Sequence, residues 1–108
     1  MKLGEIVLVA PSGEFGKPRP ALIIQSNSAS PSEYFTYLPI TSHLLLVPDV
    51  RIPVSPSAQN GLLVPSEIMV DMIQTSSLAK FSRTIGTIDS ETLHLVETSL
   101  SLHLGLDQ

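Results

Sequence analysis

The sequence predicts a mainly β, α+β fold in which one helix packs on a small antiparallel barrel. Three observations lead to this class. Short runs rich in β-branched residues recur through the first 88 positions, glycine and proline separate these runs, and helical spacing of apolar residues appears only after them. The chain shows no internal repeat, and short strands followed by a single helix are typical of a small barrel.

Length and composition favour a single unit. The chain has 108 residues, of which 43% are apolar, enough for one core and too few for two independent domains. We therefore expect residues 1–108 to form one domain. The absence of cysteine excludes disulfides and thiolate metal sites and favours a reducing cytoplasm. The N-terminal apolar run is shorter than a signal-peptide core or a membrane span, so a soluble protein without membrane contact is expected.

The first two predicted strands are 4–9 (GEIVLV) and 21–25 (ALIIQ). The segment between them, APSGEFGKPRP, is rich in glycine and proline and predicts a loop. This loop ends in Lys17-Pro18-Arg19-Pro20, where two prolines fix the backbone. Arg19 is therefore expected at a stiff strand entrance, which suits a positioned side chain.

The middle of the chain predicts strands and turns without a long helix. A polar turn at 26–33 precedes a strand at 34–40, with Thr41 and Ser42 at its end. Residues 43–67 contain four prolines and an Asn-Gly pair, which favour short strands and turns.

The last third contains two further strands and the helix. Strands are predicted at 67–75 (EIMVDMIQT) and 83–88 (RTIGTI). Asp89 is a suitable N-cap for a helix from Ser90, which Gly105 can end. The apolar residues at helical spacing are Leu93, Val96, Leu100 and Leu104.

The net charge constrains any nucleic-acid function. The chain carries a formal charge of −4, so its overall field repels a polyanion. Nucleic-acid binding would therefore require a local cluster of the six basic residues.

Several segments, in order, resemble the MazF/PemK toxins of the CcdB/MazF/Kid superfamily. They are GEIVLV, PRPALIIQS, PITS, NGLLVPSEIMVDMIQT, IGTID and LGL, and they span nearly the whole chain. The resemblance implies an SH3-like barrel, a homodimer, and the toxin role in a type II toxin–antitoxin system. It also implies sequence-specific, metal-independent cleavage of single-stranded RNA by 2′-hydroxyl attack, with no cofactor, and a cognate antitoxin whose disordered tail binds in a groove of the dimer.

The resemblance assigns the central chemistry to two intact motifs. Cleavage by a 2′-hydroxyl needs that group deprotonated, the phosphorane anion stabilised and the leaving 5′-oxygen protonated. Arg19 matches the family's Arg-Pro motif, and its guanidinium suits clamping a phosphate. Thr41 matches the Pro-Ile-Thr motif and can donate to a phosphoryl oxygen, as can Ser42.

The general base stays open among three residues. Asp71 and Glu5 align with acidic positions of the family, and His43 titrates nearest neutral pH. We favour Asp71, which is otherwise a partner that fixes Arg19. Glu5 is otherwise a surface strand residue and His43 a solvated loop residue.

The RNA-binding set comprises residues around these motifs, and one of them departs from the family pattern. The set is Glu5, Lys17, Ser42, His43 and Gln74. Gln74 stands where the pattern usually has arginine, and Met72 where it usually has glutamine. Arg83 or Arg51 could replace the missing cation, although neither lies in a matching motif.

Surface features and other functions complete the interpretation. Phe15 or Tyr34 could stack on bases. The helix residues His94 and His103 are expected at a surface or an interface. The run Leu44–Val47 is most simply one more barrel strand, or else a dimer contact or part of the antitoxin groove.

On the same barrel, the chain could instead be catalytically silent, poison a protein such as gyrase as CcdB toxins do, or only sequester a partner's disordered tail.

Overall fold

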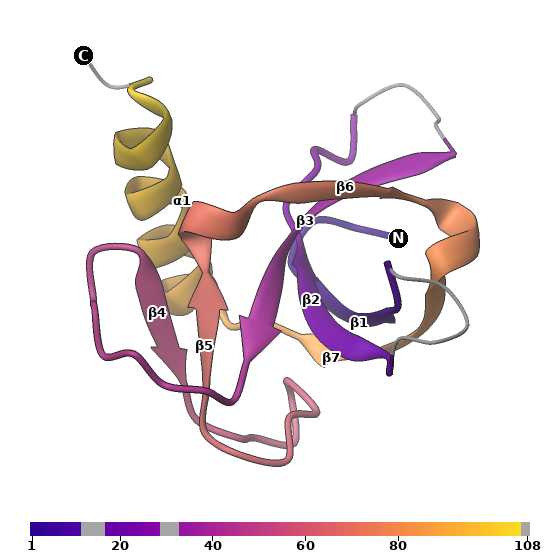
Figure 1. The fold of residues 1–108 in the computed structure, drawn as a ribbon, viewed down its shortest axis with the longest axis horizontal. Coiled ribbons are helices and arrows are strands. Elements are labelled where there is room, and N and C mark those ends of the chain that lie inside the picture. The colour runs from indigo at the N-terminus through magenta and orange to yellow at the C-terminus, as the bar shows by residue number, and fades with distance from the viewer. Residues whose placement is uncertain (12–16, 29–32, 107–108) are drawn as a thin grey trace.

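A computed structural model describes residues 1–11, 17–28 and 33–106. Figure 1 shows a strongly curved sheet with a single helix beside it. The elements are β1 (Glu5–Val9), β2 (Arg19–Ile23), β3 (Tyr34–Thr41), β4 (Arg51–Val54), β5 (Ser66–Met69), the 3-10 turn η2 (Val70–Met72), β6 (Gln74–Ser77), the 3-10 turn η3 (Leu78–Lys80), β7 (Phe81–Thr87) and α1 (Ser90–Leu104). The predicted class, mainly β with a C-terminal helix, is confirmed.

The strands follow the order β4-β5-β3-β2-β1-β7, and their pairings are antiparallel. Strand β3 is the hub of the sheet. Its first half pairs with β6, where Tyr37 faces Gln74, and its end pairs with β5, where Thr41 faces Glu67. This double pairing bends the sheet towards a barrel, and β6 arches over β3 in Figure 1.

The alternation of strand residues fills a separate core on each face of the sheet. Ile6, Leu22 and Leu38 belong to the larger cluster, which Val96 of α1 also joins. Their strand neighbours face a smaller cluster that includes Tyr37, with Phe81 packed edge-to-face against the Tyr37 ring at 5.6 Å. Because both faces are covered, the central strands are apolar on both sides.

The prediction of one strand over 67–75 is wrong. The turn η2 divides this segment into β5 and β6, because buried Val70 donates its N–H to the carbonyl of Val50. The interruption lets β5 pair with the end of β3 and β6 with its start. The second strand also begins at Arg19, two residues earlier than predicted, and the last begins at Phe81.

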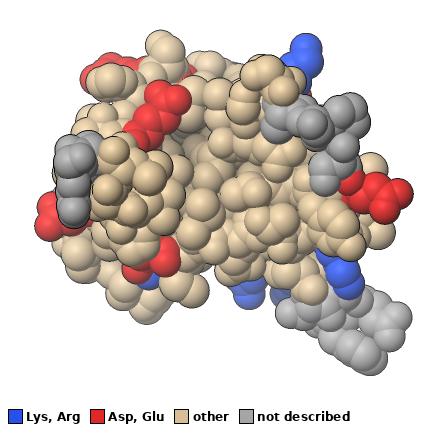
Figure 2. All heavy atoms as spheres, turned by 90° about the horizontal axis from the view of Figure 1, so that it is seen from above, with Lys and Arg blue, Asp and Glu red and all other residues tan. Residues whose placement is uncertain are grey.

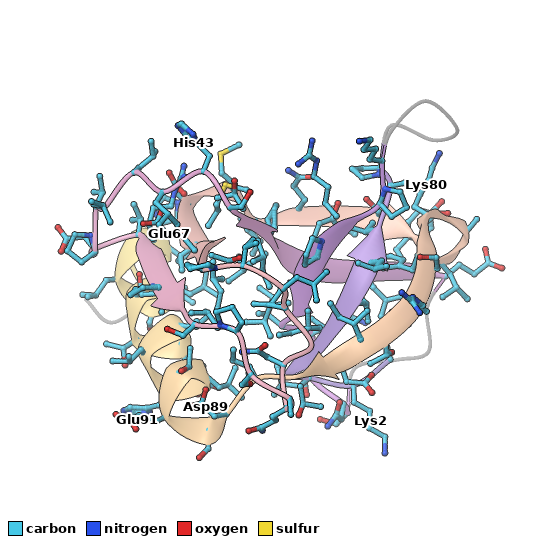
Figure 3. All side chains as sticks on the ribbon, turned by 90° about the horizontal axis from the view of Figure 1, so that it is seen from below. Lys2, His43, Glu67, Lys80, Asp89 and Glu91 are labelled. Carbon is cyan, nitrogen blue, oxygen red and sulfur yellow. The ribbon has the colours of Figure 1, made fainter. Side chains whose placement is uncertain are left out.

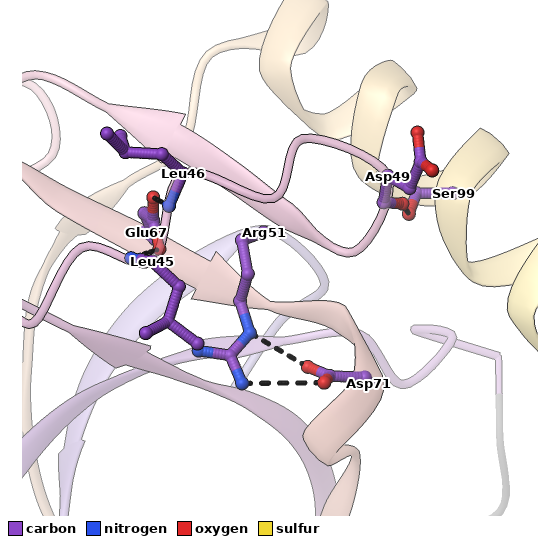
Figure 4. Close-up of polar contacts among 7 residues, drawn as sticks. All are labelled: Leu45, Leu46, Asp49, Arg51, Glu67, Asp71 and Ser99. Atoms are coloured by element: carbon purple, nitrogen blue, oxygen red, sulfur yellow. Dashed lines mark hydrogen bonds and ion pairs between the residues drawn. The ribbon is translucent and has the colours of Figure 1, made fainter.

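The interpretation of Leu44–Val47 as a barrel strand is also wrong. These residues form an exposed loop, and Leu46 is 76% exposed with a φ of 60°. The loop is fixed by Glu67, a fully buried residue whose two carboxylate oxygens accept the N–H groups of Leu45 and Leu46, each at 3.0 Å (Figure 4). The side chains of this loop therefore face outward from a firmly held backbone.

The helix begins and ends as predicted. The Asp89 carboxylate accepts the N–H of Thr92, and Gly105 closes the helix in the left-handed conformation. The backbone N–H of Thr92 holds the pKa of the Asp89 carboxyl below its ordinary value of 3.8. Among the described residues, no helix is long and apolar enough to span a membrane.

Candidate functional site

Arg19 and Thr41 meet at one edge of the sheet. Strand β2 begins at Arg19, and β3 ends at Thr41. The β2–β3 register ends with Ala21 opposite Pro39, and Arg19 and Thr41 each lie two residues beyond that pair. By alternation both side chains lie on the face that holds Tyr37. Two motifs that are far apart in the sequence are thus adjacent in the fold.

These two residues line a cavity of about 580 Å³, which we call the Thr41 pocket. Lys17, Tyr37 and Gln74 line it as well, with an apolar remainder. Of the described residues, none that lines it is acidic. The pocket therefore presents two cations, two hydroxyls and an amide, a set suited to an anionic ligand.

Tyr37, which the sequence analysis did not select, fixes the position of Gln74. Its ring is buried, and its hydroxyl donates to Oε1 of Gln74 at 3.1 Å and lies 3.0 Å from Oγ of Ser76. With Oε1 so engaged, the Gln74 nitrogen can only donate towards a ligand. The sequence signal that could have identified Tyr37 was its spacing. Tyr37, Pro39 and Thr41 are two residues apart, so they lie on the same face of a strand.

Thr41 also organises the turn that follows it. Its Oγ1 accepts the N–H of His43 at 3.0 Å, which leaves the hydroxyl proton available for donation. His43 is exposed at the same edge of the molecule as Lys80, whereas Lys2 lies at the opposite edge (Figure 3).

Asp71 does not pair with Arg19, so that alternative is wrong. Its carboxylate accepts hydrogen bonds from Arg51, at 3.0 Å from Nε and 3.4 Å from Nη2 (Figure 4). Asp71 is not among the residues that line the Thr41 pocket. The same ion pair neutralises Arg51, which therefore does not supply the cation missing at Gln74.

Glu5 lies away from this pocket. In β1, Val9 pairs with Arg19, and Glu5 is four residues further along the strand, about 13 Å at the usual rise. The Glu5 carboxylate accepts the backbone N–H of Lys2 at 2.6 Å. The structure thus separates Glu5 from Arg19 and Thr41.

A second cavity, of about 570 Å³, adjoins the first, and we call it the Arg83 pocket. Arg19 lines both cavities, and Ser42 and Arg83 line the second. Its remaining wall is largely apolar and includes Leu62, Leu63 and Ile85. From the sequence alone, Arg83 is only a possible replacement cation, because no motif connects it with Arg19.

The charges are distributed unevenly over the surface. In Figure 2 most of the visible Lys and Arg side chains gather along one edge. Lys17, Arg19 and Arg83 contribute to the two pockets, so a local basic surface exists despite the net charge of −4. Within 1–11, 17–28 and 33–106, no group of three or more His, Asp or Glu residues is arranged to hold a metal ion.

The aromatic candidates lie elsewhere or outside the description. Tyr34 is 58% exposed at the start of β3 and lines neither pocket. Phe15 lies outside the described residues. Of the described aromatic residues, Tyr37 is the one that lines either pocket.

Comparison with known proteins adds three findings. Residues 2–104 match the family model described as PemK-like, MazF-like toxin of type II toxin–antitoxin system. A protein of Mycolicibacterium smegmatis named probable endoribonuclease MazF is 29% identical over 107 residues, which are 98% of each chain. The structure of Mycobacterium tuberculosis toxin MazF-mt6 is similar with a TM-score of 0.81 and 26% identity, over 96% of this chain and 99% of that one.

A further solved structure shares the fold at lower identity. It is described as an endoribonuclease in complex with its cognate antitoxin from a mycobacterial species. The TM-score is 0.80 at 20% identity, and the match covers 98% of this chain and 96% of the other.

Proposed function

The chain belongs to the PemK-like, MazF-like toxins of type II toxin–antitoxin systems, and from this premise we propose that it is a sequence-specific endoribonuclease for single-stranded RNA. The similarity to a probable endoribonuclease over nearly the full length of both chains supports this activity. We further propose that residues 1–108 act as one domain, without a metal ion, in the cytoplasm.

The meeting of Arg19 and Thr41 in the Thr41 pocket is the observation that carries the proposal. Both belong to intact family motifs, and the fold brings them to one edge of the sheet. Lys17 and Gln74 add two more donors around the same cavity. Cationic and neutral donors without a carboxylate among them favour binding of an RNA phosphate.

In the proposed reaction the 2′-oxygen of one nucleotide attacks the adjacent phosphorus. The new P–O bond forms as the bond to the 5′-oxygen breaks, which yields a 2′,3′-cyclic phosphate and a 5′-hydroxyl. The proton lost from the 2′-hydroxyl is balanced by the one that the 5′-oxygen gains. No oxidant or metal is needed to complete this balance.

Arg19 and Thr41 act on the negative charge that develops at phosphorus. The Arg19 guanidinium binds two non-bridging oxygens, and the Thr41 hydroxyl donates to one of them. Such donors are most effective when the charge is greatest, in the phosphorane-like transition state. We leave Asp71 out of this pair because Arg51 holds its carboxylate.

We also propose a homodimer and a cognate antitoxin as partners. The exposed loop Leu44–Val47 supplies apolar surface that a partner chain would cover. A structure that shares this fold holds a cognate antitoxin, which supports the second partner.

The direct test is cleavage of a long unstructured RNA by the purified full chain in EDTA. We expect cutting by the wild type and a loss of at least about a hundredfold in Arg19→Ala and Thr41→Ala. Lys2→Ala is the matched control. Lys2 lies at the edge opposite His43 (Figure 3), and His43 is hydrogen-bonded to Thr41, so this variant should leave the rate unchanged. Absence of cutting by a folded wild type would overturn the nuclease proposal and favour a protein-targeting or silent toxin, for which the charge of −4 and Gln74 already argue.

A further inference from the structure

We propose that the Arg83 pocket binds the nucleotide next to the scissile phosphate, with Arg83 on its phosphate and the apolar wall against its base. This inference rests on the proposed function, because it assumes that Arg19 holds the scissile group. It assigns a ligand class, a single-stranded nucleotide, to this second cavity.

Arg19 is shared by the two pockets. It lines both the Thr41 pocket and the Arg83 pocket, so it lies where the two cavities meet. A strand whose phosphate binds Arg19 must continue on both sides of that phosphate. The Thr41 pocket receives one side, and the Arg83 pocket is the adjoining cavity for the other.

The chemistry of the Arg83 pocket matches a nucleotide. Its volume of about 570 Å³ lies within the range of about 300–1,000 Å³ typical of small-molecule sites. The guanidinium of Arg83 and the hydroxyl of Ser42 can hold a phosphate, while Leu62, Leu63 and Ile85 offer apolar surface to a base. Leu63 is 92% exposed, so this wall is open to a ligand.

Arg83 has its positive charge available for a ligand. In the part of the chain that the structure describes, Arg51 and Asp71 form the one ion pair. Arg83 is exposed on β7, and no described acidic residue lines its pocket. Charge complementarity therefore favours a phosphate over a cationic or neutral ligand.

The apolar wall is held firmly by the segment that precedes it. Asn60 is buried, and its Oδ1 accepts the N–H groups of Ser57 and Leu62. Gly61 packs so closely on β7 that a Cβ there would lie 2.1 Å from the carbonyl oxygen of Ile85. A Cβ at Gly86 would in turn meet the backbone of Asn60 at 2.4 Å. The pocket is thus preformed between this segment and β7.

A binding experiment separates this inference from the cleavage activity. The probe is a random-sequence pool of fluorescent 2′-O-methyl RNA, which lacks the attacking hydroxyl and so binds without being cut. We expect Arg83→Ala to weaken binding and to reduce the slope of log K against log salt by about 0.7, the value for one single-strand phosphate. Arg83→Lys should restore the slope while binding stays weaker than that of the wild type.

Two matched variants control the result. Lys80→Ala removes an exposed cation that lines neither pocket, and this variant should leave the slope at the wild-type value. Leu63→Ala should leave the slope unchanged and alter which bases are enriched in the bound pool, because Leu63 contacts the base and not the phosphate.

Failure of this inference differs from failure of the nuclease proposal. Identical binding and slope for Arg83→Ala and Lys80→Ala would overturn the nucleotide subsite, even if the wild type cuts RNA. A changed monomer–dimer equilibrium in Arg83→Ala with unchanged RNA binding would also overturn it. A reduced salt slope in Arg83→Ala, with a wild-type slope in Lys80→Ala, would support binding of a nucleotide phosphate in this pocket even if no cleavage occurs.

Discussion

The hydroxyl of Tyr37 donates to Oε1 of Gln74 across the β3–β6 pair, at 3.1 Å. A buried aromatic residue thereby sets the direction of an amide that lines the Thr41 pocket. The resemblance to the MazF/PemK toxins leads to an expectation of arginine at position 74. The pocket instead has the neutral donor Gln74 there, and Arg19 and Lys17 supply its cations.

Tyr37→Phe should weaken this arrangement without removing the ring. We expect a loss of about 1–3 kcal/mol in unfolding free energy, because both part-buried hydrogen bonds of the hydroxyl, to Gln74 and Ser76, disappear. RNA binding should weaken while the cleavage rate at saturating RNA stays close to the wild type, since Gln74 would position RNA and not stabilise the phosphorane. Urea unfolding and single-turnover cleavage measure the two effects.

Ser76→Ala is the control for Tyr37→Phe. It removes the other partner of the same hydroxyl but leaves the Gln74 contact in place, and Ser76 lines neither pocket. A smaller stability loss, about 1 kcal/mol for one hydrogen bond, is expected together with normal RNA binding. If both variants bind RNA equally well, Tyr37 has no positioning role.

Arg19→Lys tests whether geometry at the phosphate matters beyond charge. Lysine keeps the positive charge but cannot bind two oxygens in a planar fork. We expect the cleavage rate at saturating RNA to fall by about a hundredfold, with a much smaller change in RNA binding. A rate within a few-fold of the wild type would show that Arg19 contributes charge alone.

Much of the fold follows from local sequence patterns. Asp89 and Gly105 delimit the helix by capping chemistry that depends on adjacent residues, so the prediction and the structure agree there. The division of 67–75 at η2 was not predictable. It depends on the hydrogen bond from the N–H of Val70 to the carbonyl of Val50 and on the pairing of β3 with both β5 and β6. Local propensity in that segment favours an unbroken strand.

The candidate site was predictable to the extent that motifs carry it. The resemblance points to Arg19 and Thr41, and in the structure both line the Thr41 pocket. The ion pair between Arg51 and Asp71 and the role of Tyr37 arise from contacts across 20 and 37 residues of sequence, which no local pattern reports. The contacts of Glu67 with the N–H groups of Leu45 and Leu46 were not predictable for the same reason.

Glu67→Gln should loosen the exposed loop Leu44–Val47. Both carboxylate oxygens accept backbone N–H groups, and an amide would turn an N–H₂ donor towards one of them. We expect a loss of about 1–3 kcal/mol in unfolding free energy and faster amide exchange at Leu45 and Leu46. Glu97→Gln, on the exposed face of α1, should change neither quantity; equal effects would contradict this account.

Acid should destabilise the protein partly through Asp89. Its pKa is lowered in the folded state by the N–H of Thr92, so the folded protein binds a proton there less readily than the unfolded chain. The stabilisation is complete above the unfolded pKa, near 3.8, and is lost as pH falls through the lowered folded value. Urea unfolding between about pH 5 and pH 2 should show a shallower decline for Asp89→Asn than for the wild type; parallel curves would rule out this contribution.

Gly61→Ala should disrupt the junction between the 55–62 segment and β7. Gly61 has a φ of +72°, and an added Cβ would lie 2.1 Å from the backbone oxygen of Ile85, which cannot move without breaking the strand. The steric and conformational costs together predict a loss of more than about 3 kcal/mol, measured by urea unfolding. Gly4→Ala is the matched control, because its φ is +89° but its nearest neighbour would be a Leu93 side-chain atom at 3.7 Å. Only the conformational cost applies there, so we expect about 1 kcal/mol; equal losses in the two variants would show that close packing of Gly61 on β7 contributes nothing to stability.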